Sequence, residues 1–239
     1  MVMAHSLFQL LQGQEPGMAI DVVGPPWSVP LVARMPEVRR GIPLAIGHGD
    51  FALGARRALG RSLRAAGYDR AIVLPRSFKS ALVPWFAGIP VRTGFAAELR
   101  GLLLNDVRHL DRRVLDQTVK RFLALGVPAG AALPAPPTPV LRVDAANREA
   151  LLARLGLGRR PAVALMPGAA YGPAKQWPIG NVTALARQLA GRGFEIWVLG
   201  SGGEQGLGEQ IRSGAGAVVC NPCGQTSLED TVDLLSAAH

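Results

Sequence analysis

The chain has 239 residues, of which 49% are hydrophobic and 18% are charged, a composition that excludes a disordered protein and predicts a globular one. Residues 1–126 carry 17 Lys and Arg against 9 Asp and Glu, whereas residues 140–239 carry 9 against 8. The basic front half predicts an anionic partner, and a nucleic acid, an anionic membrane surface or a phosphorylated substrate would each fit.

Two features bear on cellular location. Met1 is followed by an amphipathic pattern without a basic start or a cleavage site, so we expect no secretory signal. The uncharged run at residues 122–141 contains five prolines, which break helices, and it is expected to be a linker, not a membrane span. With only two cysteines to consider, the cytoplasm is the expected compartment.

In the front half, short apolar runs alternate with helical patterns, which is typical of a parallel sheet covered by helices. The expected strands are residues 19–23, 43–46 and 70–74, with a short one near Val91. The expected helices are an opening helix after Met1 and residues 53–66, 79–86 and 114–125.

The same pattern begins again after the prolines. The expected strands there are residues 162–166, 195–199 and 217–219, and the expected helices are residues 145–155, 179–190, 204–211 and 228–239. The prediction is an α/β fold of two Rossmann-like, doubly wound domains, residues 1–126 and 142–239, joined by the linker at 127–141 and facing a cleft that holds a ligand. Both sheets are expected to be incomplete, the first lacking its opening strand and the second its later strands.

The strongest candidate site is the loop at residues 166–178, between a predicted strand and a predicted helix. Its glycines and Pro178 in the first helical turn leave backbone N–H groups facing outward at the positive end of a helix dipole. Lys175 adds a formal charge there, so the loop predicts a diphosphate site. The alternative is an ordinary loop with a solvated lysine.

Two further turns follow the later strands. Glu204, after the glycine-rich turn at residues 200–203, suits a ribose diol, although it is also placed to cap the next helix. Thr226 and Ser227 offer hydroxyl groups at another helix start, where capping is the favoured role unless a nucleotide lies nearby.

Ser77 and Lys79 follow the predicted strand at 70–74, and Arg92 is expected to repeat this arrangement after the next strand. Together they fit an anionic acceptor at the edge of the cleft. The alternative is N-capping by Ser77 combined with ordinary surface charge.

Cys220 and Cys223 have the spacing of a zinc half-site, but a zinc site needs two more ligands and no second pair exists, so two buried thiols are favoured. The histidines are scattered, and we assign them no chemistry: His5, His48, His109 and His239. We expect neither a metal nor a cofactor.

Several segments resemble one family. Residues 73–90 (VLPRSFKSALVPWFAGIP), 103–108 (LLNDVR) and 167–178 (PGAAYGPAKQWP) are similar to lipopolysaccharide heptosyltransferases of type II, and the opening residues also fit. The resemblance spans nearly the whole chain. It implies a GT-B fold and an inverting transfer of heptose from ADP-L-glycero-D-manno-heptose to the heptosyl-Kdo2-lipid A inner core.

The resemblance also implies roles for individual residues. It implies an enzyme in contact with the inner face of the inner membrane, whose basic front half meets the phosphorylated lipid and the anionic leaflet and not nucleic acid. The donor-binding residues would be Tyr171, Gly172, Lys175, Glu204, Thr226 and Ser227. The acceptor-binding residues would be Ser77, Lys79 and Arg92.

The chain also departs from the family pattern. The Asp expected to act as general base belongs to a GPxWVGD-like loop that would precede Met1, and an NDSGxxH-like donor loop would follow His239. We therefore expect no catalytic base within this sequence and little activity from it alone. The alternatives are a related glycosyltransferase that uses another sugar nucleotide and a non-catalytic nucleotide-binding remnant.

Overall fold

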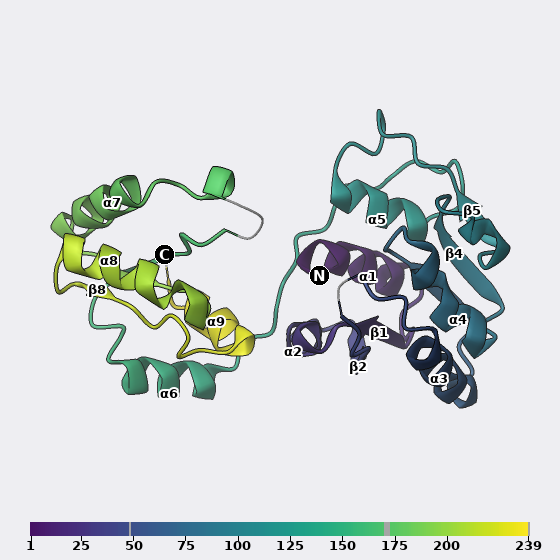
Figure 1. Ribbon diagram of the computed structural model, residues 1–239, viewed down its shortest axis with the longest axis horizontal. Coiled ribbons are helices and arrows are strands. Elements are labelled where there is room, and N and C mark those ends of the chain that lie inside the picture. Colours follow the sequence, from purple (N-terminus) through teal and green to yellow (C-terminus); the bar gives the residue numbers. More distant parts are fainter. Residues whose placement is uncertain (48, 170–172, 239) are drawn as a thin grey trace. The chain divides into compact units, whose positions relative to one another are not determined.

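The computed structural model describes residues 1–47, 49–169 and 173–238. The chain forms two compact units, Met1–Val140 and Leu141–His239. Each unit combines parallel strands with helices (Figure 1).

The first unit contains two parallel sheets. Strand β1 (Ile20–Gly24) pairs with β2 (Val38–Pro43). Strands β3 (Arg70–Val73), β4 (Val91–Phe95) and β5 (Asp106–Arg108) form a second sheet in that order. Because all pairs are parallel, the loops at the carboxyl ends of the strands of a sheet emerge at one edge.

Helices of the first unit pack in pairs, α1 against α5 and α3 against α4. The helices are α1 (Val2–Gln14), α2 (Val29–Ala33), α3 (Leu53–Leu63), α4 (Leu82–Ala87) and α5 (Thr118–Gly126). Two short 3₁₀ turns lie in the loops of the second sheet: η3 (Phe78–Ala81) comes after β3, and η4 (Arg100–Leu102) comes after β4.

The second unit is built around a parallel sheet with the strand order β6-β7-β8. Its elements are α6 (Ala145–Leu155), β6 (Ala162–Leu165), α7 (Ile179–Gly191), β7 (Glu195–Val198), α8 (Gln205–Ala215), β8 (Val219–Cys220) and α9 (Leu228–Leu235).

The central strand β7 shows why this sheet is covered on both faces. Successive side chains of a strand point to opposite faces. Ile196 and Val198 pack in one cluster with residues of α7 and α8, whereas Trp197 packs in another with residues of α6 and α9. All three side chains are fully buried, as expected for the middle strand of a parallel sheet.

Most predicted elements are confirmed within a few residues, and the helix at 145–155 agrees at both ends. The strand predicted at 43–46 is wrong, because the strand is Val38–Pro43. Two predicted helices are too long: one begins at Thr118 and not at 114, and the last ends at Leu235. Helix α2 and strand β5 were not expected.

The proline-rich segment has no helix or strand between Val127 and Asp144. Part of it is nevertheless fixed, because the backbone oxygens of Pro137 and Thr138 accept hydrogen bonds from Ser6 Oγ and Gln9 Nε2, both at 3.1 Å. Its role as a linker stays a prediction. Within the part of the chain that the structure describes, no helix has the length and apolar character to span a bilayer.

Asp21 of β1 explains how two arginines fit into strand β2. Its carboxylate accepts hydrogen bonds from Arg39 Nε and Nη2 and from Arg40 Nε, each at 2.8 Å, and from the hydroxyl of Tyr68. Burial acts to raise the pKa of Asp21, but the hydrogen bonds from Arg39, Tyr68 and Arg40 outweigh it and lower the pKa to about 2.

A carboxyl with a depressed pKa stabilises the fold above its unfolded pKa, and this contribution is lost as the pH falls. We therefore expect the free energy of unfolding to drop between about pH 4 and pH 2, by roughly 1–2 kcal/mol from this group once solvent screening of the exposed arginines is allowed for. Asp21→Asn should flatten that part of the profile when urea unfolding is followed against pH. An unchanged acid limb in the variant would contradict this assignment.

Candidate functional site

Three loops converge at the carboxyl edge of the sheet β6-β7-β8. The loops after β7 and β8 touch directly, because Gly224 N donates to Gly200 O at 3.0 Å. A Cβ atom on Gly224 would lie 2.7 Å from the Cα of Gly202, and Gly224 has a φ of 74°, so this contact requires glycine.

Glu204 joins the loop after β6 to the loop after β7. Its Oε2 accepts from the backbone N and the hydroxyl of Ser201, both at 2.7 Å, which completes a capping box. A Cβ atom on Gly168 would overlap Glu204 Oε1, and one on Gly200 would lie 2.9 Å from Oε2. The carboxylate therefore occupies the space that two glycines leave open. The capping alternative is confirmed, and the carboxylate also lies at the junction of the loops.

In the sequence, Lys175 lies between Gly168 of this junction and helix α7. It ends the 3₁₀ turn Pro173–Lys175 and its side chain is exposed. Helix α7 begins shortly afterwards, with Pro178 as its N-cap residue, so the first-turn N–H groups and the positive end of the helix dipole lie near the lysine in sequence. Tyr171 and Gly172, which were predicted to bind the donor, lie outside the described residues.

The predicted hydroxyl groups are found in the loop after β8. Ser227 Oγ accepts from Asp230 N at 3.1 Å, and Asp230 Oδ2 accepts from Ser227 N at 2.9 Å, which makes Ser227 the cap of α9. Thr226 is half-buried just before this cap. This loop reaches the junction through the contact between Gly224 and Gly200.

The loop after β3 holds Ser77 and Lys79 together on η3. Lys79 Nζ donates to Gly49 O at 2.6 Å. The alternative role of Ser77, N-capping, is not found: its side chain makes no cap hydrogen bond, and Glu98 Oε2 instead accepts from Phe78 N at 2.7 Å. A residue twenty positions further along the chain thus fixes the start of η3.

Arg92 does not join Ser77 and Lys79. It was expected after a short strand, but it lies inside β4, near the end opposite to the one from which the other loops emerge. The strand is longer than predicted because it pairs on both sides, with β3 and with β5. The guanidinium of Arg92 donates to the backbone oxygens of Leu103 and Ile89.

Arg100 was not anticipated from the sequence. It is fully buried, and its guanidinium donates to the backbone oxygens of Val73 and Pro75 and to the hydroxyl of Ser80. A Cβ atom on Gly94 would overlap this guanidinium, so the glycine of β4 provides the space for it. Burial lowers the pKa of Arg100, and the nearby Arg76 acts in the same direction. No local pattern could have revealed these contacts, because the partners lie 20 to 27 residues upstream.

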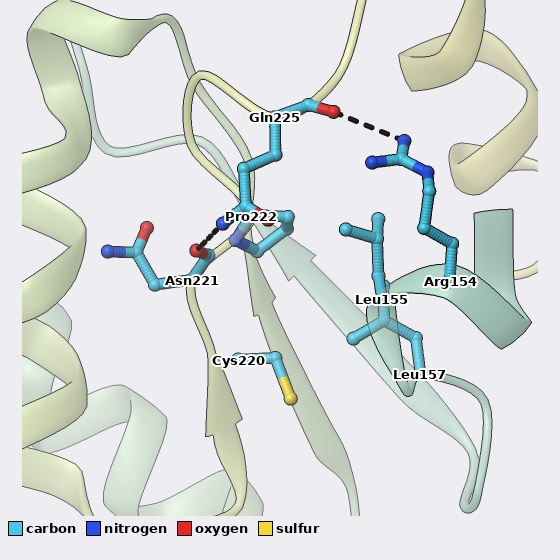
Figure 2. Close-up of a pocket in the computed structure, with 7 residues that line it drawn as sticks. All are labelled: Arg154, Leu155, Leu157, Cys220, Asn221, Pro222 and Gln225. Carbon is cyan, nitrogen blue, oxygen red and sulfur yellow. Dashed lines mark hydrogen bonds between the residues drawn. The ribbon is translucent and has the colours of Figure 1, made fainter.

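The two cysteines are free thiols. Cys223 is buried, as predicted, and its sulfur lies 3.3 Å from Val198 O. Cys220 is only half-buried and lines a pocket of about 150 Å³, which is also bordered by Arg154, whose Nη2 donates to Gln225 O at 3.2 Å (Figure 2). Burial raises the pKa of both thiols.

The pocket at Cys220 is smaller than the roughly 300 Å³ that ligands the size of a nucleotide sugar require. Among the described residues, no group of three His, Cys, Asp or Glu side chains is placed to hold a metal ion. The junction of the three loops is therefore the better candidate site in this unit.

Residues 56–239 match the family model of glycosyltransferase family 9 (heptosyltransferase). The chain is 42% identical over 248 residues to lipopolysaccharide heptosyltransferase 2 of Escherichia coli K12, covering 99% of this chain and 71% of that protein.

Two solved structures are also similar. That of E. coli ADP-heptose lipopolysaccharide heptosyltransferase II has a TM-score of 0.90 at 40% identity and covers 100% of this chain and 73% of that one. The structure of E. coli heptosyltransferase WaaC with ADP-2-deoxy-2-fluoro heptose has a TM-score of 0.73 at 25% identity, and the match covers 99% of this chain and 78% of that one.

The fold is thus that of the GT-B glycosyltransferases. The chain belongs to glycosyltransferase family 9, the heptosyltransferases, and the resemblance seen in the sequence is confirmed. It is a glycosyltransferase of lipopolysaccharide core synthesis.

Proposed function

We propose that this enzyme transfers heptose from ADP-L-glycero-D-manno-heptose to the heptosyl-Kdo2-lipid A inner core, with inversion at the transferred carbon and without a metal. The reaction would take place at the cytoplasmic face of the inner membrane, where the enzyme is a peripheral partner of the bilayer. The identity to heptosyltransferases of type II supports the choice of donor and acceptor.

The observation that carries the donor site is the convergence of three loops around Glu204, beside the loop of Lys175 and the start of α7. Lys175 and the first-turn N–H groups of α7 would bind the diphosphate, because both favour negative charge. Glu204 would accept hydrogen bonds from the ribose through Oε1, since Oε2 is already bound to the backbone N and hydroxyl of Ser201. Tyr171, Gly172, Thr226 and Ser227 complete the proposed set.

The chemistry of such a site is stabilisation of the leaving group. The bond between the anomeric carbon and the diphosphate oxygen breaks, so negative charge grows on ADP as it departs. A fixed cation and helix N–H groups are worth most where that charge develops. The acceptor hydroxyl attacks the opposite face of the same carbon, which inverts its configuration. We assign no residue of this chain as the base that takes the hydroxyl proton.

The acceptor side would be the η3 region of the first unit. Ser77 and Lys79 lie on one short turn, and Arg76 precedes them. Three polar or cationic side chains there suit the phosphate and carboxylate groups of an inner core. Arg92, whose guanidinium is bound to backbone oxygens, is not part of this proposed surface.

Nucleotide selectivity tests the donor assignment. We expect ADP to bind the purified chain, and UDP and GDP to bind at least about tenfold more weakly, because a site that hydrogen-bonds one base leaves its polar groups unpaired with another. Titration calorimetry with each nucleotide measures this directly. Preferential binding of UDP or GDP would instead indicate a glycosyltransferase that uses another sugar nucleotide.

A further inference from the structure

Residues 96–104, here called the tip, expose two leucines to an unusual degree. Leu99 is 82% exposed and Leu102 is 81% exposed, whereas Trp27, the next most exposed large hydrophobic residue among those that the structure describes, reaches 65%. Solitary exposed leucines are common on protein surfaces, but a pair in one turn exposed to this extent calls for a partner. We infer that the tip is the part of this enzyme that contacts an anionic lipid bilayer.

The two leucines are presented together. Leu102 N donates to Leu99 O at 3.2 Å, so the residues are one turn apart around η4. Leu99 is the residue before η4 and Leu102 is its last residue, so the two exposed leucines belong to one turn and are called here the leucine surface.

The exposure of this surface is fixed by the residues beside it. Glu98 and Leu99 have φ values of 45° and 57°, a left-handed conformation that costs free energy for residues other than glycine. Glu98 is held by Phe78 N, and Arg100 is held by the backbone oxygens of Val73 and Pro75. Both anchors face inward, so the leucines between and beside them must face outward.

The charges around the tip identify the partner. Two cations, Arg76 and Lys79, lie in the neighbouring segment 75–80, whereas the charge of Arg100 is buried and the one carboxylate, Glu98, is bound to a backbone N–H. Exposed apolar side chains next to cations match the interface of a bilayer that contains anionic lipids. Nucleic acid would require stacking aromatic residues at this place, and the tip contains none.

The inference deepens the proposed function, because η3 carries the proposed acceptor residues Ser77 and Lys79 and is bound to the tip through Glu98. A lipid-anchored acceptor would then be met where the enzyme touches the membrane. Binding to a bilayer does not depend on heptose chemistry, so the two proposals can fail separately.

The test is flotation of the full chain with vesicles of phosphatidylcholine alone and of phosphatidylcholine mixed with phosphatidylglycerol. These vesicles contain no lipopolysaccharide precursor, so acceptor recognition cannot contribute. We expect binding only to the anionic vesicles, and we expect Leu99→Ser/Leu102→Ser to weaken it by about tenfold or more, since each leucine loses apolar burial.

The matched control is Val114→Ser/Val140→Ser, which removes two aliphatic side chains that are each 61% exposed elsewhere in the first unit. It should bind the vesicles like the parent. Both variants should keep the parent's urea midpoint, because exposed substitutions away from structural contacts cost little stability.

Three results would overturn the inference: no binding of the parent to anionic vesicles, equal binding by the leucine variant, or a leucine variant that changes only the oligomeric state in sedimentation, which would assign the surface to a second copy. ADP titration of the same samples reports separately on the proposed donor site.

Discussion

Lys175→Ala should weaken ADP binding by about 10- to 100-fold, since a hydrogen bond to a charged group contributes about 1.5–3 kcal/mol. In the proposed site the lysine meets the diphosphate next to the N-terminus of α7, where little else in the described loop supplies positive charge. The dissociation constant is measured by titration calorimetry. The effect should shrink with AMP, which lacks the second phosphate.

Lys120→Ala is the matched control. Lys120 is another of the chain's three lysines, and its ammonium pairs with Asp116 at 2.8 Å on the surface of the first unit. Its loss should leave ADP affinity unchanged. If Lys175→Ala weakened AMP and ADP equally, Lys175 would contact the nucleoside end and not the diphosphate.

Gly168→Ala should damage both the stability and the binding of the second unit. The new methyl group would overlap Glu204 Oε1, so Glu204 must move and its capping box with Ser201 must break. Loss of a capping interaction costs about 0.5–2 kcal/mol, and we expect a loss of that size in the free energy of unfolding together with weaker ADP binding. Urea unfolding and ADP titration of one preparation measure the two effects.

A double-mutant cycle isolates the cause. In a Glu204→Ala background the overlapping atoms are absent, so Gly168→Ala should cost little further stability. Gly191→Ala serves as a control, because no atom lies within 4 Å of a Cβ at this position at the far end of α7. An equal cost of Gly168→Ala in both backgrounds would show that the backbone of the loop, not Glu204, excludes a side chain.

Sequence periodicity predicted most of the fold because buried strands such as β7 and amphipathic helices such as α6 have strong local patterns. It failed for β2, because Arg39 and Arg40 break the apolar run that would have indicated a strand there. Their charges are balanced by Asp21, a residue of the neighbouring strand that no local pattern connects to them.

For the candidate site, too, local features could be predicted from the sequence and contacts between distant residues could not. The glycine-rich turns and Lys175 were proposed from the sequence because loop chemistry is local. Capping was foreseen as the favoured role of Ser227 and as the alternative role of Glu204. The fit of Glu204 against Gly168 was not, because it depends on two loops separated by a helix and a strand. The anchoring of η3 by Glu98 was missed for the same reason.

The two thiols determine how this protein can be labelled. Cys220 and Cys223 are the chain's only cysteines, and burial keeps both protonated at neutral pH. The thiolate is the form that attacks a maleimide, so the native thiols react slowly with such reagents. A single cysteine introduced at the exposed Leu99 position would therefore take a fluorophore or spin label selectively without prior removal of either native cysteine.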